Sequence, residues 1–489
     1  MRLNFPQDLS HLEDSVWRVF LRKGRRGSKR GKEYGFRGNV GSGMYAMGDA
    51  FKNAGLIFGT VVTLFLSVIS VHCQHILLTC SEEMQRRMKL TSPPDFASTV
   101  ELCFSTGPVK FRGLATTMRR LVNMFLCVTQ LGFCCVYFVF ISTNIKKIFD
   151  HFDLYMDIHI YMAIVLVPIL LSCLVRNLKY LAPLSAVANL LMAAGVTITI
   201  YFASQDLPAL SSRKYIGSLS SIPLFFGTTI YAFEGIGLVR NNNSNIIQQY
   251  APLFDFVYSP SVYRMNYHAL KNNINAIKLL PTHKNCILTN AYIYKQNLAG
   301  DKAGEAGEVS FGVLNLGMVV VTSLLIAVGF LGYLQWGDEV QGSLTLNLPP
   351  DNVLIVQGIL ALGIIFTYPI QFYVPVDIIW PEIKEKYGPF NSPKTLELSL
   401  RVALVFVTFI FAEAIPNLGL FISLVGAISS TALALLFPPV IEMISRSQDA
   451  EGVPVTVIIK NSLILVLGLL GFATGTYESV RAIVNEFAS

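Results

Sequence analysis

The chain has 489 residues, of which 53% are hydrophobic and only 14% are charged. Soluble globular proteins carry about 25% charged residues. The apolar residues here form continuous runs of about 20, the length of a helix that crosses the ~30 Å hydrocarbon core of a bilayer. These features exclude a soluble enzyme and a disordered chain, and they predict an all-α polytopic membrane protein.

Eleven apolar elements follow one another along the chain. They cover residues 44–53, 56–80, 121–143, 158–175, 181–203, 219–239, 311–334, 353–376, 396–412, 415–443 and 455–477. This pattern predicts five regions. They are a basic N-terminal segment (1–38), six transmembrane helices (39–239), an atypical cytosolic loop or insertion (240–310), five further helices (311–480) and a short extracytosolic tail (481–489).

The positive charges indicate how the helices are oriented. If the N-terminus is cytosolic, the segments on the cytosolic side hold 32 of the 38 Lys and Arg residues, and the opposite side holds 6. Cytosolic loops of membrane proteins carry such an excess. The net charge of +7 is therefore explained by topology and by contact with anionic lipid, and it does not indicate a nucleic-acid partner.

Two of the eleven elements are interrupted by glycine. Residues 44–53 would span only about 15 Å as a helix, and they follow the glycine-rich segment 38–43. The sixth element places Glu234 beside Gly235, and a carboxylate inside a membrane span is costly and usually functional. If ten helices form two halves of five, the interrupted elements are the first of each half, and this pattern indicates a transporter site.

Unwound helix ends suit a zwitterion. The N-terminus of a half-helix favours a carboxylate, and C-terminal ends and free carbonyl groups favour an ammonium group. The two breaks therefore predict an amino-acid site, although the glycines alone would also allow helices to pack closely. The sequence has no phosphate-binding loop and no Cys/His cluster with metal spacing, so we expect no ATP-driven pump, no cofactor and no metal.

Five segments resemble the amino acid/auxin permease family, and within it the proton-assisted amino acid transporters. They read GNVGSGMYAMGDAFKNAGLIFGT (38–60), FFGTTIYAFEGIGLV (225–239), FGVLNLGMVVV (311–321), GYLQWGDEVQGSLTLNLP (332–349) and YPIQFYVPVDIIWP (368–381). The resemblance implies a LeuT-like fold of the APC superfamily, with 11 transmembrane helices in an inverted repeat of five plus five and one extra helix. It also implies proton-coupled symport of small neutral amino acids across a plasma, lysosomal or vacuolar membrane, and no enzyme activity.

The resemblance also implies which residues bind the substrate. They are Gly41, Ser42 and Gly43 in the first break, Tyr231, Phe233, Glu234 and Gly235 in the second, and Tyr368, Gln371 and Phe372, which would complete the site or its outer gate. For Glu234 two roles stay open. It would either couple transport to protons or accept hydrogen bonds from unwound backbone, and the second role is slightly favoured.

The sequence departs from the family at two places. The family usually has a histidine, implicated in proton coupling, just before its first motif, and the matching position here is Tyr34. Residues 240–308 show no helical or strand period, and 29 of the 57 residues at 241–297 are Asn, Ile, Lys, Tyr or Phe, all with AT-rich codons. This bias favours a translated intron or an unusual splice form over a regulatory cytosolic loop.

Three functions compete. The leading one is a secondary transporter driven by a proton gradient, whose partners are small amino acids, protons and the lipid bilayer. The second is a sensor that binds amino acids and signals through residues 240–310 without transporting them. The third is an inactive splice form of a transporter. The sequence does not indicate an oligomeric state.

Overall fold

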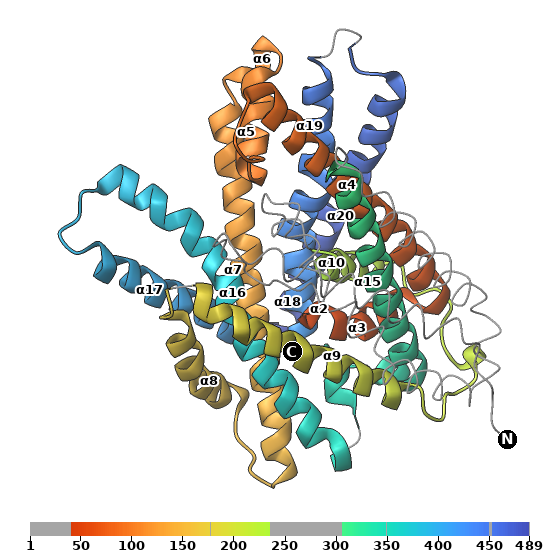
Figure 1. Cartoon of the computed structure of the whole chain (residues 1–489). Coiled ribbons are helices and arrows are strands. Elements are labelled where there is room, and N and C mark those ends of the chain that lie inside the picture. The colour runs from red at the N-terminus through yellow and green to blue at the C-terminus, as the bar shows by residue number, and fades with distance from the viewer. Residues whose placement is uncertain (1–40, 177, 235–305, 349, 449–451, 489) are drawn as a thin grey trace, which may run out of the picture. The chain divides into compact units, whose positions relative to one another are not determined.

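The computed structural model describes residues 41–176, 178–234, 306–348, 350–448 and 452–488. Every regular element within these ranges is a helix (Figure 1). In the first part of the chain they are α2 (Ser42–Tyr45), α3 (Met47–Ala54), α4 (Leu56–Met88), α5 (Phe96–Thr106), α6 (Val109–Arg112), α7 (Ala115–His151), α8 (Ile158–Cys173), α9 (Leu178–Ala203), η1 (Leu210–Ser212) and α10 (Ile222–Ala232).

The second part of the chain is also helical. Its elements are α15 (Ala306–Trp336), η3 (Gly337–Glu339), η4 (Leu344–Asn347), α16 (Pro350–Tyr387), α17 (Pro393–Ala414), α18 (Leu418–Val425), η5 (Gly426–Ser430), η6 (Ala432–Leu436), α19 (Phe437–Arg446) and α20 (Val455–Ala488). Helix α18, the π-helical turns η5 and η6, and α19 follow one another without a break, as one helical stretch.

Seven helical stretches within the described residues are long and apolar enough to cross a membrane. They are Leu56–Met88, Ala115–His151, Gly317–Glu339, Ile355–Tyr387, Pro393–Ala414, Leu418–Arg446 and Val455–Ala488. Three shorter apolar helices, Ile158–Cys173, Val187–Ala203 and Ile222–Ala232, accompany them. These lengths agree with the multi-pass membrane protein expected from the sequence.

Most described residues of the predicted apolar runs are helical, and several helices extend past the apolar residues. Residues 219–221 and 415–417, at the starts of two predicted runs, are not helical. Helix α4 continues from the apolar run to Met88 because polar residues add helix-stabilising pairs, such as Arg87 with Glu83 one turn earlier, at 2.6 Å. Helix α5 was not predicted, because it is short and lies in a mostly polar segment. Its start is fixed by Asp95, whose side chain accepts a hydrogen bond from the Ser98 amide.

Gly55 separates α3 from α4. Its φ of 84° is a conformation that residues with a side chain rarely adopt, and a Cβ there would lie 2.8 Å from the backbone of Tyr215 and Ile216. The loop before α10 comes this close because it is hydrogen-bonded to the end of α3. The Gly217 amide donates to the Ala54 carbonyl at 2.6 Å. This contact ties the end of α3 to the segment that leads into α10.

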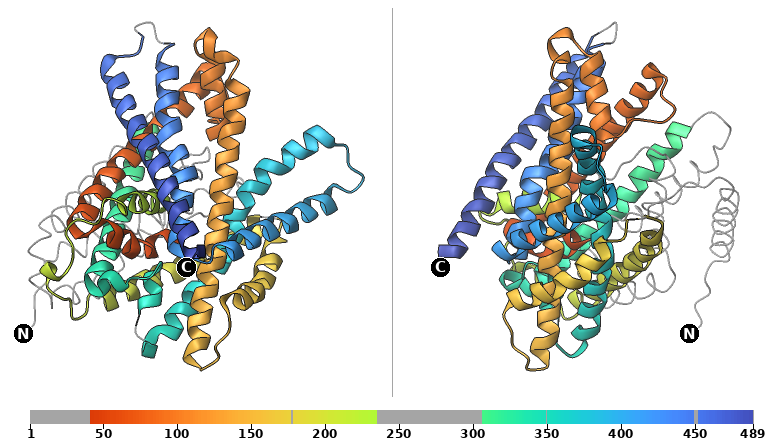
Figure 2. Two further views of the ribbon diagram at one scale, coloured as in Figure 1. Left: turned by 180° about the vertical axis from the view of Figure 1, so that it is seen from behind. Right: turned by 90° about the vertical axis from the view of Figure 1, so that its left-hand side faces the viewer.

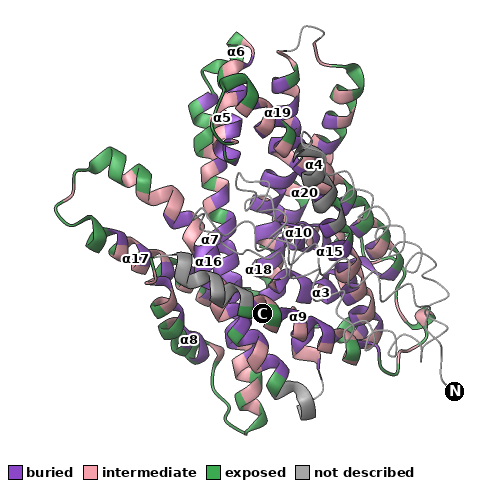
Figure 3. Cartoon of the chain, in the orientation of Figure 1, coloured by how far each residue is buried: buried purple, intermediate pink, exposed green. Residues whose placement is uncertain are grey.

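The stretch from α18 to α19 lies in the interior of the bundle. In an apolar 18-residue segment of this stretch 78% of the residues are buried, whereas in the corresponding segment of α20 only 22% are buried. Figure 3 shows buried residues along α18 and α10, and exposed residues along α8 and the outer part of α17. Helix α7 packs along α16, and α10 packs against α3, α18 and η5.

Helices α10 and α18 cross in direct backbone contact. A methyl group at Gly426 would collide with the Gly227 carbonyl oxygen, and one at Gly227 would lie 2.9 Å from the Ser423 hydroxyl. Small residues at such crossings let two helices approach closely. The π-helical turns η5 and η6 begin at this crossing, and π-helical turns frequently mark functional sites.

A carboxylate joins α19 to α20 at one end of the bundle. Glu442 accepts hydrogen bonds from Arg446 at 3.1 Å, from Lys460 at 2.8 Å and from Asn461 at 3.0 Å. The two helices lie side by side in both views of Figure 2. A second carboxylate, Glu397 on α17, bonds Arg176 after α8, and this bond raises the pKa of Arg176 above its ordinary value.

Candidate binding site

The helical segment after the first glycine-rich motif begins at Ser42. Gly41 precedes it in an extended conformation, with φ −138° and ψ −163°, and no side chain caps the turn. Ser42 and Gly43, which the sequence analysis placed in the first break, instead lie in the short helix α2. Residues 38–40 of the motif lie outside the described residues.

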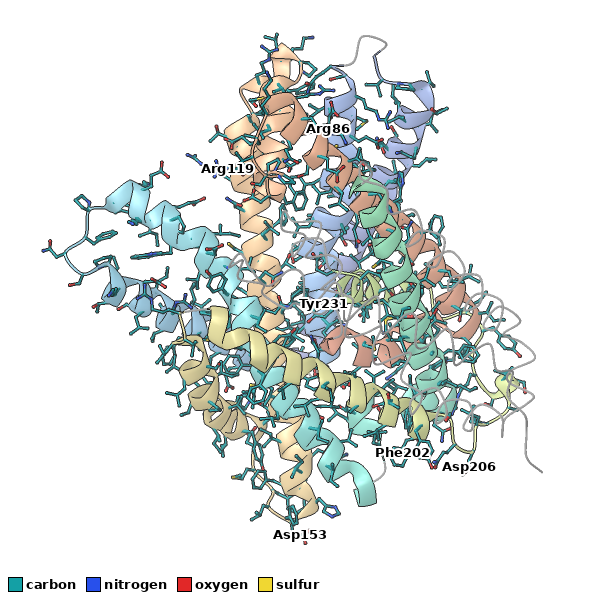
Figure 4. All side chains as sticks on the ribbon, viewed as in Figure 1. Arg86, Arg119, Asp153, Phe202, Asp206 and Tyr231 are labelled. Carbon is teal, nitrogen blue, oxygen red and sulfur yellow. The ribbon has the colours of Figure 1, made fainter. Side chains whose placement is uncertain are left out.

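Helices α2 and α10 meet through three residues. The hydroxyl groups of Ser42 and Tyr231 share a hydrogen bond of 3.0 Å. A Cβ at Gly43 would lie 3.0 Å from both the Ala232 Cα and the Tyr231 ring, so only glycine leaves room for this approach. We refer to Ser42, Gly43 and Tyr231 as the α2–α10 junction, and Figure 4 shows Tyr231 in the interior of the bundle.

The second interrupted element stops being helical where the sequence predicted a break. Helix α10 ends at Ala232, Phe233 follows as its C-cap, and the Glu234 amide donates to the Tyr231 carbonyl. The last carbonyl groups of a helix have no intrahelical donor, so α10 presents partial negative charge at this end. Glu234 is buried, and Gly235 lies outside the described residues.

Helix α7 contributes aromatic side chains to the junction, and the sequence analysis missed them. The Phe133 ring meets the Tyr231 ring edge-on, with centroids 4.6 Å apart. The Tyr137 hydroxyl lies 3.5 Å from the place where a Cβ of Gly41 would be. The available signal was a pair of aromatic residues four apart on one face of an apolar helix, but most such pairs only pack in the core.

Helix α16 joins the junction through Tyr137 rather than directly. The Tyr137 and Tyr368 rings lie 6.4 Å apart, and Tyr368 stacks on Phe372 at 6.0 Å. The Gln371 amide lies against the Tyr137 hydroxyl. The Tyr368 hydroxyl instead shares a hydrogen bond of 2.7 Å with Thr408 on α17, so it is engaged away from the junction.

The structure therefore brings most of the predicted residues into one region. Gly41, Ser42, Gly43 and Tyr231 lie together, and Gln371, Tyr368 and Phe372 reach them by way of Tyr137. Phe233 and Glu234 follow Tyr231 directly at the end of α10 and are buried. The polar groups of this region are hydroxyls, amides, helix ends and one carboxylate.

The end of α3 is held by a loop and by another helix. The Lys52 ammonium group donates to the Val340 carbonyl at 3.0 Å. A Cβ at Gly419, at the start of α18, would lie 2.8 Å from the Asp49 carboxylate, and one at Gly342 would lie 2.7 Å from the Gly419 nitrogen. Helix α3 therefore packs closely against residues 340–342 and the start of α18.

No group of three or more His, Cys, Asp or Glu residues within the described ranges is placed to hold a metal ion. His72 and Cys73 on α4 lie near the Glu442–Lys460 pair, which has its own hydrogen-bond partners within α19 and α20. That cluster consists of one carboxylate shared by three donors, which is a structural tie and not a metal site.

Comparisons with known proteins identify relatives along most of the chain. Residues 37–243 and 305–481 match the family model described as "Transmembrane amino acid transporter protein", and the match leaves out residues 244–304. The "Proton-coupled amino acid transporter-like protein pathetic" of Drosophila melanogaster is 31% identical over 456 residues, which cover 93% of this chain and 84% of that protein. The "Probable amino acid transporter skat-1" of Caenorhabditis elegans is 24% identical over 466 residues, covering 91% and 88%.

Among solved structures, the "Inward facing conformation of Mhp1" is similar with a TM-score of 0.41 and 10% sequence identity, covering 93% of this chain and 90% of that chain. A likeness at this score is no guide to the position of individual residues.

Proposed function

Because this chain belongs to the amino acid/auxin permease family of transmembrane amino acid transporters, we propose that it moves small neutral amino acids across a membrane by proton-coupled symport. The observation that carries the proposal is the junction of two interrupted helices, joined by the Ser42–Tyr231 hydrogen bond of 3.0 Å. Transporters bind substrate where discontinuous helices meet.

In the proposed mechanism the two helix ends bind the two charges of the amino acid. The carboxylate lies at the first turn of α2, because the first amides of a helix have no acceptor within that helix. The ammonium group lies at the carbonyl end of α10. The hydroxyls of Ser42 and Tyr231, together with Gln371, supply hydrogen bonds, while Phe233, Tyr368 and Phe372 enclose the site.

We further propose that these breaks belong to an inverted repeat of five plus five helices with one extra helix, 11 transmembrane helices in all. In this arrangement α2–α3 and α10 open the two halves, and the N-terminus is cytosolic. The excess of Lys and Arg on one side of the predicted topology supports that orientation. The membrane in which the protein resides is the plasma membrane or a lysosomal or vacuolar membrane.

Glu234 has two candidate roles in the proposed cycle. It is buried directly after the end of α10. As a proton carrier it would titrate during each cycle, whereas as a structural residue it would orient the unwound backbone by accepting amide hydrogen bonds. We favour the structural role, which predicts that Glu234→Gln retains proton-dependent uptake of alanine and that Glu234→Leu does not.

A second candidate function follows from the unmatched segment. The family match omits residues 244–304, which fall within the predicted insertion at 240–310. Residues 240–305 of that insertion lie outside the described residues, whereas 306–310 are helical, as the start of α15, and do not belong to the predicted loop. Tyr34, at the position of the family's histidine, also lies outside the described residues. An insertion directly after an interrupted helix would suit a sensor that binds amino acids without moving them, or an inactive splice form.

Uptake and binding measured on the same preparation separate these functions. Purified protein in liposomes is given radiolabelled glycine, alanine or proline at acid outside pH, and binding is measured in detergent by thermal stabilisation. Uptake that falls when the proton gradient is collapsed supports symport. Binding without uptake contradicts transport and supports the sensor, and neither uptake nor binding supports the inactive form.

A further inference from the structure

One buried amide on α7 has no hydrogen-bond partner within the part of the chain that the structure describes. Gln130 is fully buried, and neither its Nε2 nor its Oε1 has a hydrogen-bond partner among the described residues. Buried polar side chains are nearly always hydrogen-bonded, because leaving a donor or an acceptor unpaired is costly. The cost is greater inside a membrane, where lipid supplies no partner. A ligand is therefore expected to bond this amide.

The helix geometry places Gln130 beside the α2–α10 junction. Residues three and seven positions apart share one face of a helix, so Gln130 lies on the face that carries Phe133 and Tyr137. Phe133 contacts the Tyr231 ring at 4.6 Å, and Tyr137 lies against Gly41. Gln130 is thus one turn along α7 from the contact with Tyr231.

A second glutamine approaches the same region from α16. Gln371 is buried against the Tyr137 hydroxyl, and its Oε1 has no hydrogen-bond partner within the described residues. Two amides with unfilled bonding capacity therefore flank the aromatic residues of the junction. This clustering distinguishes Gln130 from a solitary core glutamine that binds one trapped water.

The unpaired atoms of the Gln130 side chain restrict which chemical group can bind to it. The amide offers donors at Nε2 and an acceptor at Oε1, and both are unfilled. A carboxylate only accepts hydrogen bonds and an ammonium group only donates them, whereas a hydroxyl or an amide does both. Because the proposed site binds the carboxylate and the ammonium group at the two helix ends, a hydroxyl or amide side chain is the remaining group of the substrate that can satisfy both atoms.

We propose that Gln130 is a specificity-determining residue that binds the side chain of the transported amino acid, favouring small amino acids with a hydroxyl or amide side chain over those with an apolar one. This inference rests on the proposed function and narrows its substrate class. Serine is the preferred probe, and alanine is its closest match without the hydroxyl.

The test compares serine and alanine uptake by wild type, Gln130→Leu and the control Thr129→Val. Thr129 is the neighbouring buried residue on α7, and its hydroxyl donates to the Phe125 carbonyl of its own helix. Because a site built to bond a hydroxyl strongly rejects the analogue that lacks it, we expect the ratio of serine to alanine kcat/KM to fall at least about tenfold in Gln130→Leu. Alanine uptake persists, and Thr129→Val leaves the ratio unchanged.

An unchanged ratio in Gln130→Leu overturns the inference, because a trapped water or a structural role would produce that result. If Gln130→Leu does not fold, Gln130→Met, which is unbranched and of similar length, replaces it. If wild type takes up neither amino acid, transport is contradicted, and thermal stabilisation by serine against alanine still tests Gln130. A wild-type protein that serine stabilises no more than alanine also overturns the inference.

Discussion

The hydrogen bond between Ser42 and Tyr231 joins residues that are 189 positions apart in the chain. Each hydroxyl is buried. Ser42 is the first residue of α2, and Tyr231 lies one residue before the end of α10. In the proposed site this bond fixes the distance between the two helix ends that receive the amino acid. Its removal is therefore expected to weaken substrate binding more than folding.

Tyr231→Phe tests this bond, because it removes the hydroxyl and keeps the ring against Phe133. One neutral hydrogen bond contributes about 1 kcal/mol, so we expect the KM for alanine uptake to rise roughly fivefold. Tyr45→Phe is the matched control, since it removes an equally long bond of 3.0 Å to the Met192 carbonyl.

Ser42→Ala completes a double-mutant cycle with Tyr231→Phe. If both residues act through their shared bond, the double variant raises KM no more than either single variant does. Fully additive effects, or a KM in Tyr231→Phe that equals that of Tyr45→Phe, would show that the bond does not position substrate.

The hydrogen-bond partner of Tyr368 could not be predicted from the sequence. Its place in a family motif predicts substrate contact, but its hydroxyl is bonded to Thr408 on α17 at 2.7 Å. A motif predicts which residue type lies on which helix. It does not predict which neighbouring helix a long side chain is hydrogen-bonded to. The same limit explains why Phe133 and Tyr137 were missed, since an aromatic pair on an apolar helix does not indicate which neighbouring helix its face contacts.

Tyr368→Phe is accordingly expected to affect stability. The loss of the bond to Thr408 lowers the free energy of unfolding by about 1 kcal/mol and leaves the KM for alanine unchanged. Thermal unfolding in detergent and uptake kinetics in liposomes measure the two effects. A raised KM with unchanged unfolding temperature would place the Tyr368 hydroxyl in the substrate site instead.

The crossing of α10 with α18 and η5 sets the position of Tyr231. Gly227 and Gly426 bring the two backbones into contact, and a Cβ at Gly426 would also lie 2.9 Å from the Tyr231 Cβ. Because this crossing is fixed by backbone atoms, no side-chain adjustment relieves an added methyl group. The junction with α2 depends on it.

Gly426→Ala is therefore expected to push α10 away from η5. Overpacking of this kind costs about 1–3 kcal/mol, so we expect a lower unfolding temperature and strongly reduced alanine uptake. Gly358→Ala on α16 is the control, because the nearest atom to its Cβ would be Ile148 Cδ1 at 4.0 Å. Alanine favours a helix over glycine, so the control should unfold at the same or a higher temperature. Equal stability of the two variants would contradict a backbone contact at Gly426.

The helices were largely predictable from the sequence, and their contacts were not. Long apolar runs located the described helices to within a few residues at many ends, because a membrane span needs a fixed length of apolar chain. Helix α10 ends at Ala232, two residues before Glu234, where the sequence predicts unwound backbone. Helix α5 and the π-helical turns η5 and η6 were not expected, because they depend on a cap and on packing between distant segments.

Two regions of the chain match the family, and an unmatched segment separates them. The family match covers residues 37–243 and 305–481, and these regions contain every residue of the proposed site. The proposed fold therefore does not require residues 244–304. The choice between a transporter, a sensor and an inactive form depends on what that segment does.

Deleting residues 244–304 tests its contribution. We expect the shortened chain to unfold at no lower temperature than the full chain and to take up alanine at least as fast, because both matched regions remain intact. Size-exclusion profiles, thermal unfolding and uptake measure these outcomes. Binding retained with uptake lost on deletion would assign the segment a required role in transport.

A structure of the purified full-length protein with bound alanine, determined by electron cryo-microscopy, tests where the amino acid binds. We predict density for the ligand between α2 and α10, with its polar atoms within hydrogen-bond distance of Ser42, Tyr231 or the carbonyl end of α10. Ligand density at another place, such as the Glu442–Lys460 cluster, together with an empty α2–α10 junction, would contradict the proposed site.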